Sequence, residues 1–474
     1  MDYGQRGATN HTHTFTGIPD VSDFRQRTQT ETTLHTNSQR QSWSALLRAI
    51  VLATQSLLTM ASADDWPHWR GPLRNDVSAE ESGWDGGSWA VQPVWQTRVG
   101  EGSSSPLVVG DCVYLTGWSD EQDTLFCLNL ATGKQIWKQS YDAPRYGRFS
   151  IGDKALYSGP CSTPESDDDT AYLFTLGIDG TLSAWNTAAS GRRVWSRQLY
   201  EEYGAQQRPE VAERRKTQRD YGYIGSPLVT GSQLIVEVGG STGNIVGFDK
   251  RTGEQRWTSK NRDEAGHTGG PVLIVVEGSL CVAVLTLRNL VVTAVEGPSV
   301  GETIAHYPWT TDFGNNVATP AVHEDSVLIT SAYNHFAMCR LRITHRGAEK
   351  VWENTMASGV CSPLIHDGHV YWAWRGIHCV DFETGQERWS GGNIAAQGSC
   401  ILTADNSLNV YGNKGDLLLT ETARRSPDKY TQLASKSVFS EADAWPHVVL
   451  AHGYLICRDR AGNVCCYSTS EHNH

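Results

Sequence analysis

The chain contains 474 residues, with 40 Lys and Arg against 52 Asp and Glu, which gives a net charge of −12 at neutral pH. This acidic balance argues against a binder of nucleic acid or of anionic membranes, because both depend on clustered basic side chains. A hydrophobic content of 39% and a charged content of 19% are typical of a folded protein. The 46 Gly and 17 Trp indicate frequent turns and a recurrent use of tryptophan.

The first 63 residues are predicted to be a leader. Residues 1–43 are polar and lack hydrophobic periodicity, so we expect them to be disordered. An apolar stretch over residues 49–60 then ends in Ala61-Ser62-Ala63, small residues of the kind that a signal peptidase reads. We therefore expect a disordered leader plus a signal peptide over residues 1–63, and a periplasmic or cell-envelope location. An uncleaved anchor and a buried helix are the alternatives for the apolar stretch.

Four segments after the leader align on the pattern Asp/Asn-x-x-Thr/Ser-Gly-x-x-x-Trp, preceded by a small and an apolar residue; the copy that ends at Trp195 has one more residue before its Ser-Gly. The Asp or Asn can bind turn amides, Gly tolerates a positive φ, and Trp offers a large flat surface for packing, so the pattern predicts a strand, a tight turn and another strand. The residues of this blade motif are Asn129, Gly133, Trp137, Trp195, Asp249, Gly253, Trp257, Asp381, Gly385 and Trp389.

A second landmark, a small residue followed by Pro and an apolar run, precedes each Trp by about 30 residues. The copies are Ser105-Pro106, Thr163-Pro164, Ser226-Pro227, Gly270-Pro271, Thr319-Pro320 and Ser362-Pro363. Pro is tolerated at the first residue of a strand, where its missing donor costs no ladder bond. Each unit therefore contains four short antiparallel strands, the signature of a β-propeller blade.

Eight such units fit the chain, and seven is the alternative count. Trp309 and Trp352 are expected to mark the outer strands of blades four and five, which lack the Thr-Gly turn. The last unit has no Trp strand of its own, whereas Trp95 lies unclaimed before the first, so we expect the N-terminal strand to close the ring. We thus predict an all-β propeller over residues 94–470, a lead-in segment over 64–93 and a tail over 471–474.

The Trp repeat resembles the tryptophan-docking motif of the pyrroloquinoline-quinone (PQQ)-like β-propellers. This superfamily contains quinoprotein alcohol dehydrogenases and the lipoprotein scaffold of the outer-membrane β-barrel assembly machinery. The stretch from Asp64 to Pro72, DDWPHWRGP, is similar to the start of exported PQQ-like repeat proteins of planctomycete-type bacteria. The resemblance covers nearly all of the chain after the leader, and it implies a fold better than a function, because propellers host many unrelated activities.

Quinoprotein dehydrogenases of this superfamily hold PQQ at the ring centre with a Ca²⁺ ion, a catalytic Asp and a vicinal disulfide. The vicinal pair Cys465-Cys466 falls in the last strand, where Cys466 aligns with Cys127 and with other small residues of the repeat. We interpret the pair as small buried residues, with a redox pair as the alternative. The blades also lack the long insertions of such enzymes, so we expect no cofactor and no metal, with PQQ and Ca²⁺ as the alternative.

The 11 cysteines are an odd number, which leaves at least one unpaired. Cys112 with Cys127, and Cys361 with Cys379, fall on neighbouring predicted strands, so either pair is a candidate disulfide. Sequence does not fix the partners.

Residues that lead into the innermost strands converge on one mouth of a propeller channel. The candidate binding residues there are Ser104, Tyr223, His267, Asn315, Asn316 and Ser358. They are polar and uncharged, which suits a peptide, a sugar or bound water better than a charged cofactor. A charged insertion over residues 201–220 is a candidate partner contact.

Two functions follow from these observations. The first is an exported non-catalytic propeller that serves as a protein- or peptide-binding scaffold in the cell envelope, without catalytic residues, as a monomer and without affinity for nucleic acid. The second is a PQQ-dependent quinoprotein-type oxidoreductase.

Overall fold

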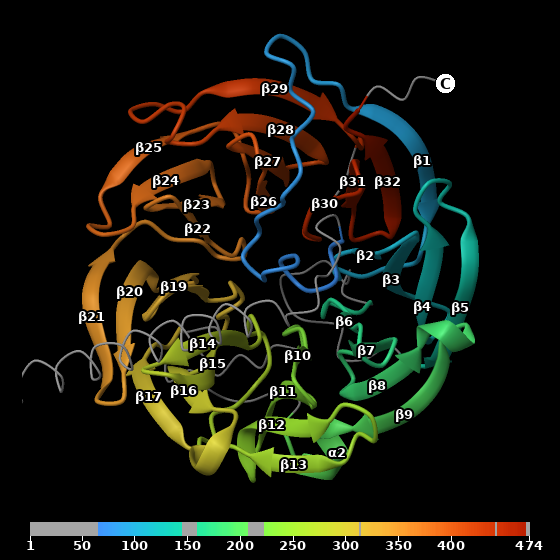
Figure 1. The fold of residues 1–474 in the computed structure, drawn as a ribbon, viewed down its shortest axis with the longest axis vertical. Coiled ribbons are helices and arrows are strands. Elements are labelled where there is room, and N and C mark those ends of the chain that lie inside the picture. The colour runs from blue at the N-terminus through green and yellow to red at the C-terminus, as the bar shows by residue number, and fades with distance from the viewer. Residues whose placement is uncertain (1–64, 145–158, 207–221, 312–313, 441–442, 471–474) are drawn as a thin grey trace, which may run out of the picture. The chain divides into compact units, whose positions relative to one another are not determined.

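A computed structural model describes residues 65–144, 159–206, 222–311, 314–440 and 443–470. The predicted leader, the tail and most of the charged insertion lie outside these ranges. The described residues form 32 strands in eight four-stranded antiparallel sheets, which confirms the predicted all-β, eight-bladed propeller (Figure 1). The blade count is therefore eight and not seven.

The first four blades follow one another along the chain. Blade 1 contains β2 (Leu107–Val109), β3 (Cys112–Ser119), β4 (Gln122–Asn129) and β5 (Gln135–Asp142). Blade 2 contains β6 (Glu165–Asp167), β7 (Tyr172–Leu176), β8 (Thr181–Asn186) and β9 (Arg192–Gln198). Blade 3 contains β10 (Leu228–Thr230), β11 (Gln233–Gly240), β12 (Gly243–Asp249) and β13 (Gln255–Thr258). Blade 4 contains β14 (Val272–Val276), β15 (Ser279–Leu285), β16 (Asn289–Ala294) and β17 (Thr303–Pro308).

The second half of the ring repeats this order until the last blade. Blade 5 contains β18 (Ala321–His323), β19 (Ser326–Ala332), β20 (Phe336–Thr344) and β21 (Gly347–Asn354). Blade 6 contains β22 (Leu364–His366), β23 (His369–Ala373), β24 (Ile377–Asp381) and β25 (Glu387–Gly391). Blade 7 contains β26 (Gly398–Leu402), β27 (Ser407–Gly412), β28 (Asp416–Glu421) and β29 (Gln432–Ser437). Blade 8 contains β30 (Val449–Ala451), β31 (Tyr454–Arg458), β32 (Asn463–Ser468) and, as its outer strand, β1 (Gln92–Arg98).

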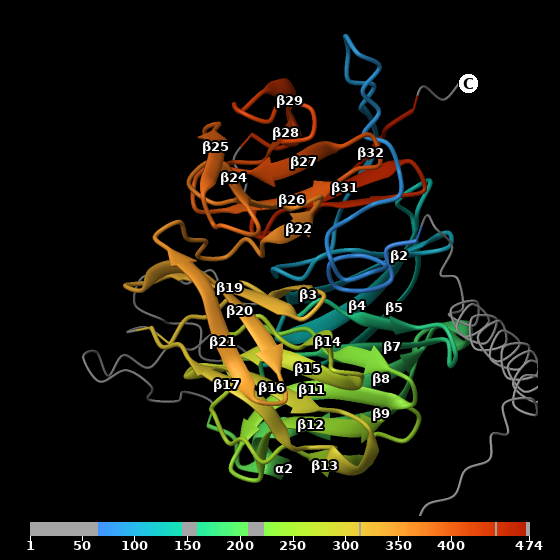
Figure 2. The same ribbon diagram turned by 60° about the vertical axis from the view of Figure 1, so that its left-hand side comes forward.

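The N-terminal strand closes the ring as the sequence predicts. β1 pairs antiparallel with β32, with Trp95 opposite Cys466, and both views show these strands side by side (Figures 1 and 2). The other regular elements are small: the 3₁₀ turns η1 (Thr187–Ala189) and η2 (Gly297–Ser299) and the helix α2 (Leu199–Tyr203). No helix in the described ranges is long and apolar enough to cross a membrane.

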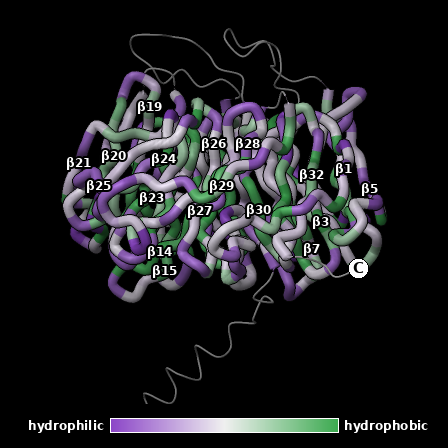
Figure 3. The backbone as a smooth tube through the Cα atoms, turned by 90° about the horizontal axis from the view of Figure 1, so that it is seen from above, coloured by the Kyte–Doolittle hydropathy of each residue, from purple (hydrophilic) through white to green (hydrophobic). Residues whose placement is uncertain are grey.

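Hydrophobic residues lie within the blades, whereas hydrophilic residues concentrate at the turns on the two faces (Figure 3). The core consists of clusters between neighbouring blades. One cluster joins blades 8, 1 and 7 through residues such as Val464, Leu115 and Tyr411, each of which is fully buried. Burial of facing sheet surfaces therefore stabilises the ring one junction at a time.

A β-bulge lies at one equivalent place in every blade, between the third and the outer strand. Six blades have a Trp at this bulge: Trp95, Trp137, Trp195, Trp257, Trp352 and Trp389. Blades 4 and 7 have Ala305 and Ala434 there instead. The expectation for Trp309 was wrong, because this residue follows β17, is 2% exposed and stacks on His335 at 4.1 Å.

Each Trp that precedes a Thr/Ser-Gly turn packs against the turn Gly of the next blade. A Cβ added to Gly133 would come within 2.5 Å of the Trp95 ring, and the same relation joins Gly191 to Trp137. Gly253 with Trp195, and Gly385 with Trp352, repeat it. Nε1 of Trp95 also donates to the Leu130 carbonyl at 2.6 Å. The Trp and Gly of the sequence motif therefore make contacts between neighbouring blades, although the motif itself is a spacing within one blade.

Candidate functional site: the closed channel

The lead-in segment occupies the centre of the ring. We call residues 66–78 the central segment; in Figure 1 it is the blue chain that enters between the inner strands. Trp66 exchanges two backbone hydrogen bonds with Val108 of β2, at 2.8 and 3.1 Å. Val77 forms a bridge with Leu402 of β26. The segment therefore covers the inner edges of blades 1 and 7, which would otherwise expose unpaired backbone groups.

Arg70 is the anchor of the central segment. Its side chain is 2% exposed, and its Nε donates to Oδ2 of fully buried Asp76 at 2.5 Å. Its two terminal nitrogens donate to the carbonyls of Pro320 at 3.3 Å and Pro363 at 2.6 Å. One guanidinium thus binds the inner strands of blades 5 and 6 together with its own segment. Arg70 and Asp76 also have positive φ values of 69° and 63°, a strained conformation that surrounding contacts must hold.

Arg74 makes a second buried ion pair, on the other side of the ring. Its guanidinium donates twice to the fully buried Glu165 carboxylate of β6, which also accepts from the Val229 amide at 2.9 Å. His68 lies 3.2 Å from the same carboxylate. Burial would raise the pKa of Glu165, but the charges of Arg74 and His68 outweigh it and lower the pKa to about 2.

The Ser or Thr that precedes a Pro at the start of a blade joins that blade to the preceding one. The hydroxyl of Thr163 accepts from the Ser105 amide at 3.0 Å, and the hydroxyl of Ser226 accepts from the Thr163 amide at 3.0 Å. Ser362 accepts from Thr319 at 3.0 Å, and Ser105 accepts from His447 at 2.9 Å. Side chains of this size and polarity are therefore needed around the channel to pair amides that the blades leave open.

A cavity of about 290 Å³ lies above the central segment, with lining residues from all eight blades. Trp69 contributes an indole whose Nε1 donates to the Thr319 hydroxyl at 3.0 Å. Nδ1 of His267 donates to Oδ1 of Asn315 at 2.8 Å, and both residues line the cavity. The remaining lining residues are Ser103, Ser105, Cys161, Thr163, Ile224, Ser226, Thr268, Gly269, Val317, Thr319, Tyr333, Val360, Ser362, Ala396 and Trp445.

A family model described as "Outer membrane protein assembly factor BamB" matches residues 88–212 and 159–391, which together span more than half of the chain. The chain belongs to this family of PQQ-like β-propeller repeat proteins. One curated relative, the outer membrane protein assembly factor BamB of Burkholderia pseudomallei (strain K96243), is 29% identical over 175 residues. That match spans 36% of this chain and about a third, 34%, of the relative.

Solved structures share the fold of this PQQ-like propeller at low sequence identity. BamB from Moraxella catarrhalis has a TM-score of 0.53 at 12% identity, over 80% of this chain and 99% of that one. The computationally designed Ika8 protein has a TM-score of 0.51 at 11% identity, with the same coverage. The quinohemoprotein alcohol dehydrogenase ADHIIG of Pseudomonas putida HK5 has 0.51 at 14%, over 86% of this chain and 80% of that one. These similarities concern the fold alone.

Two of the six predicted mouth residues, His267 and Asn315, line the cavity of this PQQ-like propeller. The other four are buried beside it. The Ser104 hydroxyl bonds to that of Thr116 and accepts from Arg458, and the Ser358 hydroxyl donates to the Cys361 carbonyl. The Tyr223 hydroxyl donates to the Val238 carbonyl at 2.6 Å, and Nδ2 of Asn316 donates to the Thr286 carbonyl at 2.7 Å. The residues within two positions of them in the chain that line the cavity are Ser103, Ser105, Ile224, Asn315, Val317 and Val360.

A buried carboxyl group stands behind the cavity wall. Glu237 of β11 accepts from the Thr268 hydroxyl at 2.6 Å and from Nδ2 of Asn244 at 3.3 Å. Burial raises the pKa of Glu237 to about 7, although these two hydrogen bonds act in the opposite direction. Thr268 itself lines the cavity, so it separates this carboxyl group from the cavity.

The charge of the cavity lining decides which cofactors fit. Its residues include no Lys, Arg, Asp or Glu, and the described part of the chain holds no cluster of three potential metal ligands. PQQ carries carboxylates that need cationic partners, and its Ca²⁺ needs several carboxylate or amide oxygens, of which this lining offers only the Asn315 amide. The lining therefore does not fit PQQ with Ca²⁺, and we derive no redox step through them.

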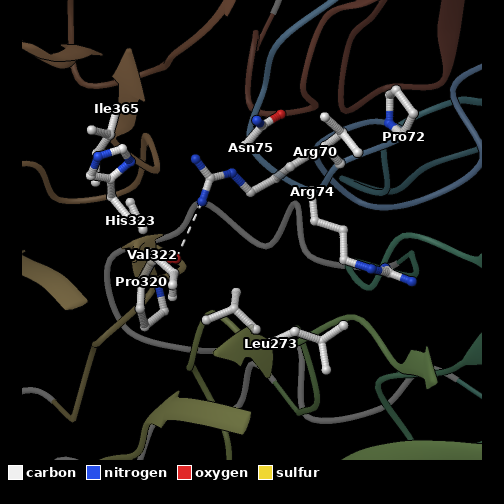
Figure 4. Close-up of a pocket in the computed structure, with 12 residues that line it drawn as sticks. Arg70, Pro72, Arg74, Asn75, Leu273, Pro320, Val322, His323 and Ile365 are labelled. Atoms are coloured by element: carbon white, nitrogen blue, oxygen red, sulfur yellow. Dashed lines mark hydrogen bonds between the residues drawn. The ribbon is translucent and has the colours of Figure 1, made fainter. Parts of the chain in front are cut away.

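A second hollow of about 350 Å³ lies on the opposite side of the central segment, against β14, β18 and β22 (Figure 4). Arg70 and Arg74 reach past it, and the dashed line in Figure 4 marks the bond from Arg70 to Pro320. Both guanidiniums are already paired with buried carboxylates. The central segment thus contributes lining residues to both hollows.

All eleven cysteines are free thiols in the structure. Cys112 and Cys127 are hydrogen-bond neighbours, and this contact lowers the pKa of the Cys112 thiol to about 6. Cys361 is the neighbour of Cys400 on the next blade, and not of Cys379. Burial raises the pKa of both vicinal thiols, to about 12 for Cys465 and in the same direction for Cys466, as expected for small core residues.

Proposed function

We propose that this protein is an exported, non-catalytic scaffold that binds a protein or peptide of the cell envelope through the mouth of its channel. The observation that carries this proposal is the cavity itself, whose wall is neutral and whose floor is closed by a firmly bonded segment. Such a wall offers hydrogen bonds and aromatic surface without a nucleophile activated by a base. Membership of the BamB-type family supports the same role, because the relative from Burkholderia pseudomallei is an outer membrane protein assembly factor.

Photo-crosslinking from the two faces of one blade tests the scaffold role. Asn334 is exposed beside Tyr333 of the cavity, whereas Glu324 is exposed beside His323 of the opposite hollow. Both belong to turns of blade 5 and have positive φ values, 72° and 53°, so a crosslinking residue perturbs them alike. We expect discrete adducts with one envelope protein from position 334 and none from position 324. Equal labelling from both positions, or none from either, would contradict the proposal.

Export is tested separately at the protein's N-terminus. We propose cleavage after Ala63, which leaves a mature chain that starts at Asp64. Cell fractionation followed by N-terminal sequencing of the purified protein measures this directly. Recovery of an intact leader in the cytoplasmic fraction would refute export, whatever the outcome of crosslinking.

A further inference from the structure

Four of the hydroxyl groups that line the cavity each retain a proton to donate. Ser105, Thr163, Ser226 and Ser362 accept one amide hydrogen bond apiece, and none of them donates to an acceptor within the described ranges. Their exposures are 2, 2, 8 and 3%, and all four line the cavity. A hydroxyl has one donor and two acceptor positions, and a buried donor without an acceptor costs free energy. An occupant with several oxygen acceptors satisfies these donors.

Aromatic side chains supply the apolar part of the same cavity. Trp69, Tyr333 and Trp445 line it and are only half-buried, although they lie inside the ring. The bond from Trp69 to Thr319 and the edge contact of its ring with His447, at 5.3 Å between centroids, hold the Trp69 indole in place. A flat indole offers a large apolar contact area and loses little conformational freedom when a ligand packs on it.

The absence of charge in the lining selects against ions. A carboxylate or ammonium group that enters this wall loses water without gaining an ionic partner, whereas a hydroxyl group exchanges water for the bonds of the serine and threonine ring. The volume of about 290 Å³ is at the small end of the range for small-molecule sites, roughly 300 Å³. A compact ring with apolar C–H faces and a rim of neutral hydroxyls has the matching chemistry.

We infer that the cavity binds a neutral saccharide, with one pyranose ring packed on an indole of the lining and its hydroxyls bonded to the ring of serine and threonine side chains. This site is a small-molecule site within the channel. It goes beyond the scaffold role and does not depend on it.

Titration of the purified protein with matched sugars tests the inference. The probes are glucose, N-acetylglucosamine and maltose, each measured by calorimetry and by ligand-observed NMR. Glucuronate and glucosamine serve as charged counterparts of the same ring. We expect one site per chain for at least one neutral sugar, and binding weaker by about 10-fold or more for its charged counterpart. No saturable binding by any of the three neutral sugars, or equal binding of charged and neutral forms, would overturn the inference.

Two serines allow a matched comparison. Ser399 performs the same junction role as Ser362, since its hydroxyl accepts from the Val448 amide at 3.1 Å, but it does not line the cavity. Ser362→Ala should weaken sugar binding about 10-fold relative to Ser399→Ala, while both variants lose one hydrogen bond between blades. Trp445→Ala should weaken binding at least as much. Sugar binding that is equal in all three variants and the native protein would place the site elsewhere and refute the inference.

The crosslinking readout at position 334 is independent of these sugar titrations. Failure of the saccharide inference is therefore distinguishable from failure of the scaffold proposal.

Discussion

The rim and the centre of the ring are stabilised by opposite kinds of chemistry. At the rim, an apolar contact recurs from junction to junction, with a Trp of one blade against a turn Gly of the next. At the centre, a single-copy segment makes buried ion pairs, of Arg70 with Asp76 and of Arg74 with Glu165. The rim tolerates loss of the Trp in single blades, since Ala305 and Ala434 replace it in blades 4 and 7. This is possible because each junction between blades depends only on its neighbours. The centre has no second copy that could substitute.

The largest expected effect comes from breaking the central ion pair. Arg70→Met leaves the Asp76 carboxylate buried without its cation and removes two bonds to inner-strand carbonyls, so we expect a loss of about 3–5 kcal/mol in the free energy of unfolding. The rim pair of Arg256 with Asp249 is the control, since its side chains are 38 and 22% exposed. Arg256→Met should cost less than about 1 kcal/mol. Chemical denaturation measures both, and equal losses would contradict the contrast.

The next effect is a pH dependence that originates at Glu237. Its pKa is raised from 4.5 to about 7 by burial, so the folded state holds a proton that the unfolded state releases. Stability from this group is complete below pH 4.5 and is lost as the pH rises through 7, by about 3 kcal/mol. Denaturation between pH 5 and 8, compared with Glu237→Gln, measures it. A parallel pH slope in the two proteins would show that Glu237 does not titrate in this way.

Glu165 has the opposite sign, which provides an internal check. Its pKa is lowered to about 2, so its contribution is present above the unfolded value of 4.5 and is lost as the pH falls toward 2. The contributions of the two buried carboxyl groups therefore fall in opposite directions away from about pH 4.5. Removal of Glu237 should abolish only the loss that occurs as the pH rises toward 7.

A smaller effect is expected at the rim. Gly133→Ala would place a Cβ within 2.5 Å of the Trp95 ring, whereas a Cβ at Gly110, in the same blade, meets nothing within 4 Å. Both residues have positive φ, 66° and 53°, so the backbone cost of Ala is similar. We expect Gly133→Ala to be the more destabilising by about 2 kcal/mol, the cost of overpacking. Thermal and chemical denaturation of the pair provide the measurement, and matching values would exclude the packing contact as the cause.

The smallest stability difference separates two tryptophans. Nε1 of Trp95 donates to Leu130 at the next blade, whereas Nε1 of buried Trp389 has no acceptor among the described residues. Trp95→Phe loses ring area and a hydrogen bond, but Trp389→Phe loses ring area and an unpaired donor. The first should cost about 1 kcal/mol more than the second. Reversal of this order would indicate that Trp389 finds a partner that compensates for the missing acceptor.

PQQ with Ca²⁺ is expected to have no effect. Because the lining offers no charged partner for either, reconstitution followed by gel filtration should leave no stoichiometric quinone absorbance with the protein and no dye-linked alcohol oxidation. Retention of one quinone per chain would show that the centre accommodates charge in a way that its lining residues do not explain.

Sequence predicted the rim because the rim repeats. Equivalent residues recur in successive units, so Gly133 and Trp137 could be assigned to a turn and a strand without coordinates. Two limits appeared even there. A spacing within one blade does not show that the Trp–Gly contact joins two blades. In blade 4 the bulge position is occupied by Ala305, so Trp309 was assigned wrongly to the outer strand.

The centre could not be predicted in this way. Arg70 contacts residues 320 and 363, 250 and 293 positions away, and a single copy has no periodicity to reveal it. Four of the six predicted mouth residues do not line the cavity, for a different reason. Successive side chains of an extended segment point to opposite sides, so Ser103 and Ser105 face the cavity while Ser104 is buried behind it. Sequence identified the segments but not which alternate residue faces inward.

Closure by β1 also constrains the order in which the protein forms. Residues 92–98 leave the ribosome long before their partners at 463–468, and the central segment contacts blades 5, 6 and 8. Neither the last blade nor the bonded centre can be completed until nearly the whole chain exists. During synthesis β1 therefore has an open edge, and the slowest folding step should be the joining of the two ends. A truncation before β32 should leave a collapsed intermediate and not a smaller ring.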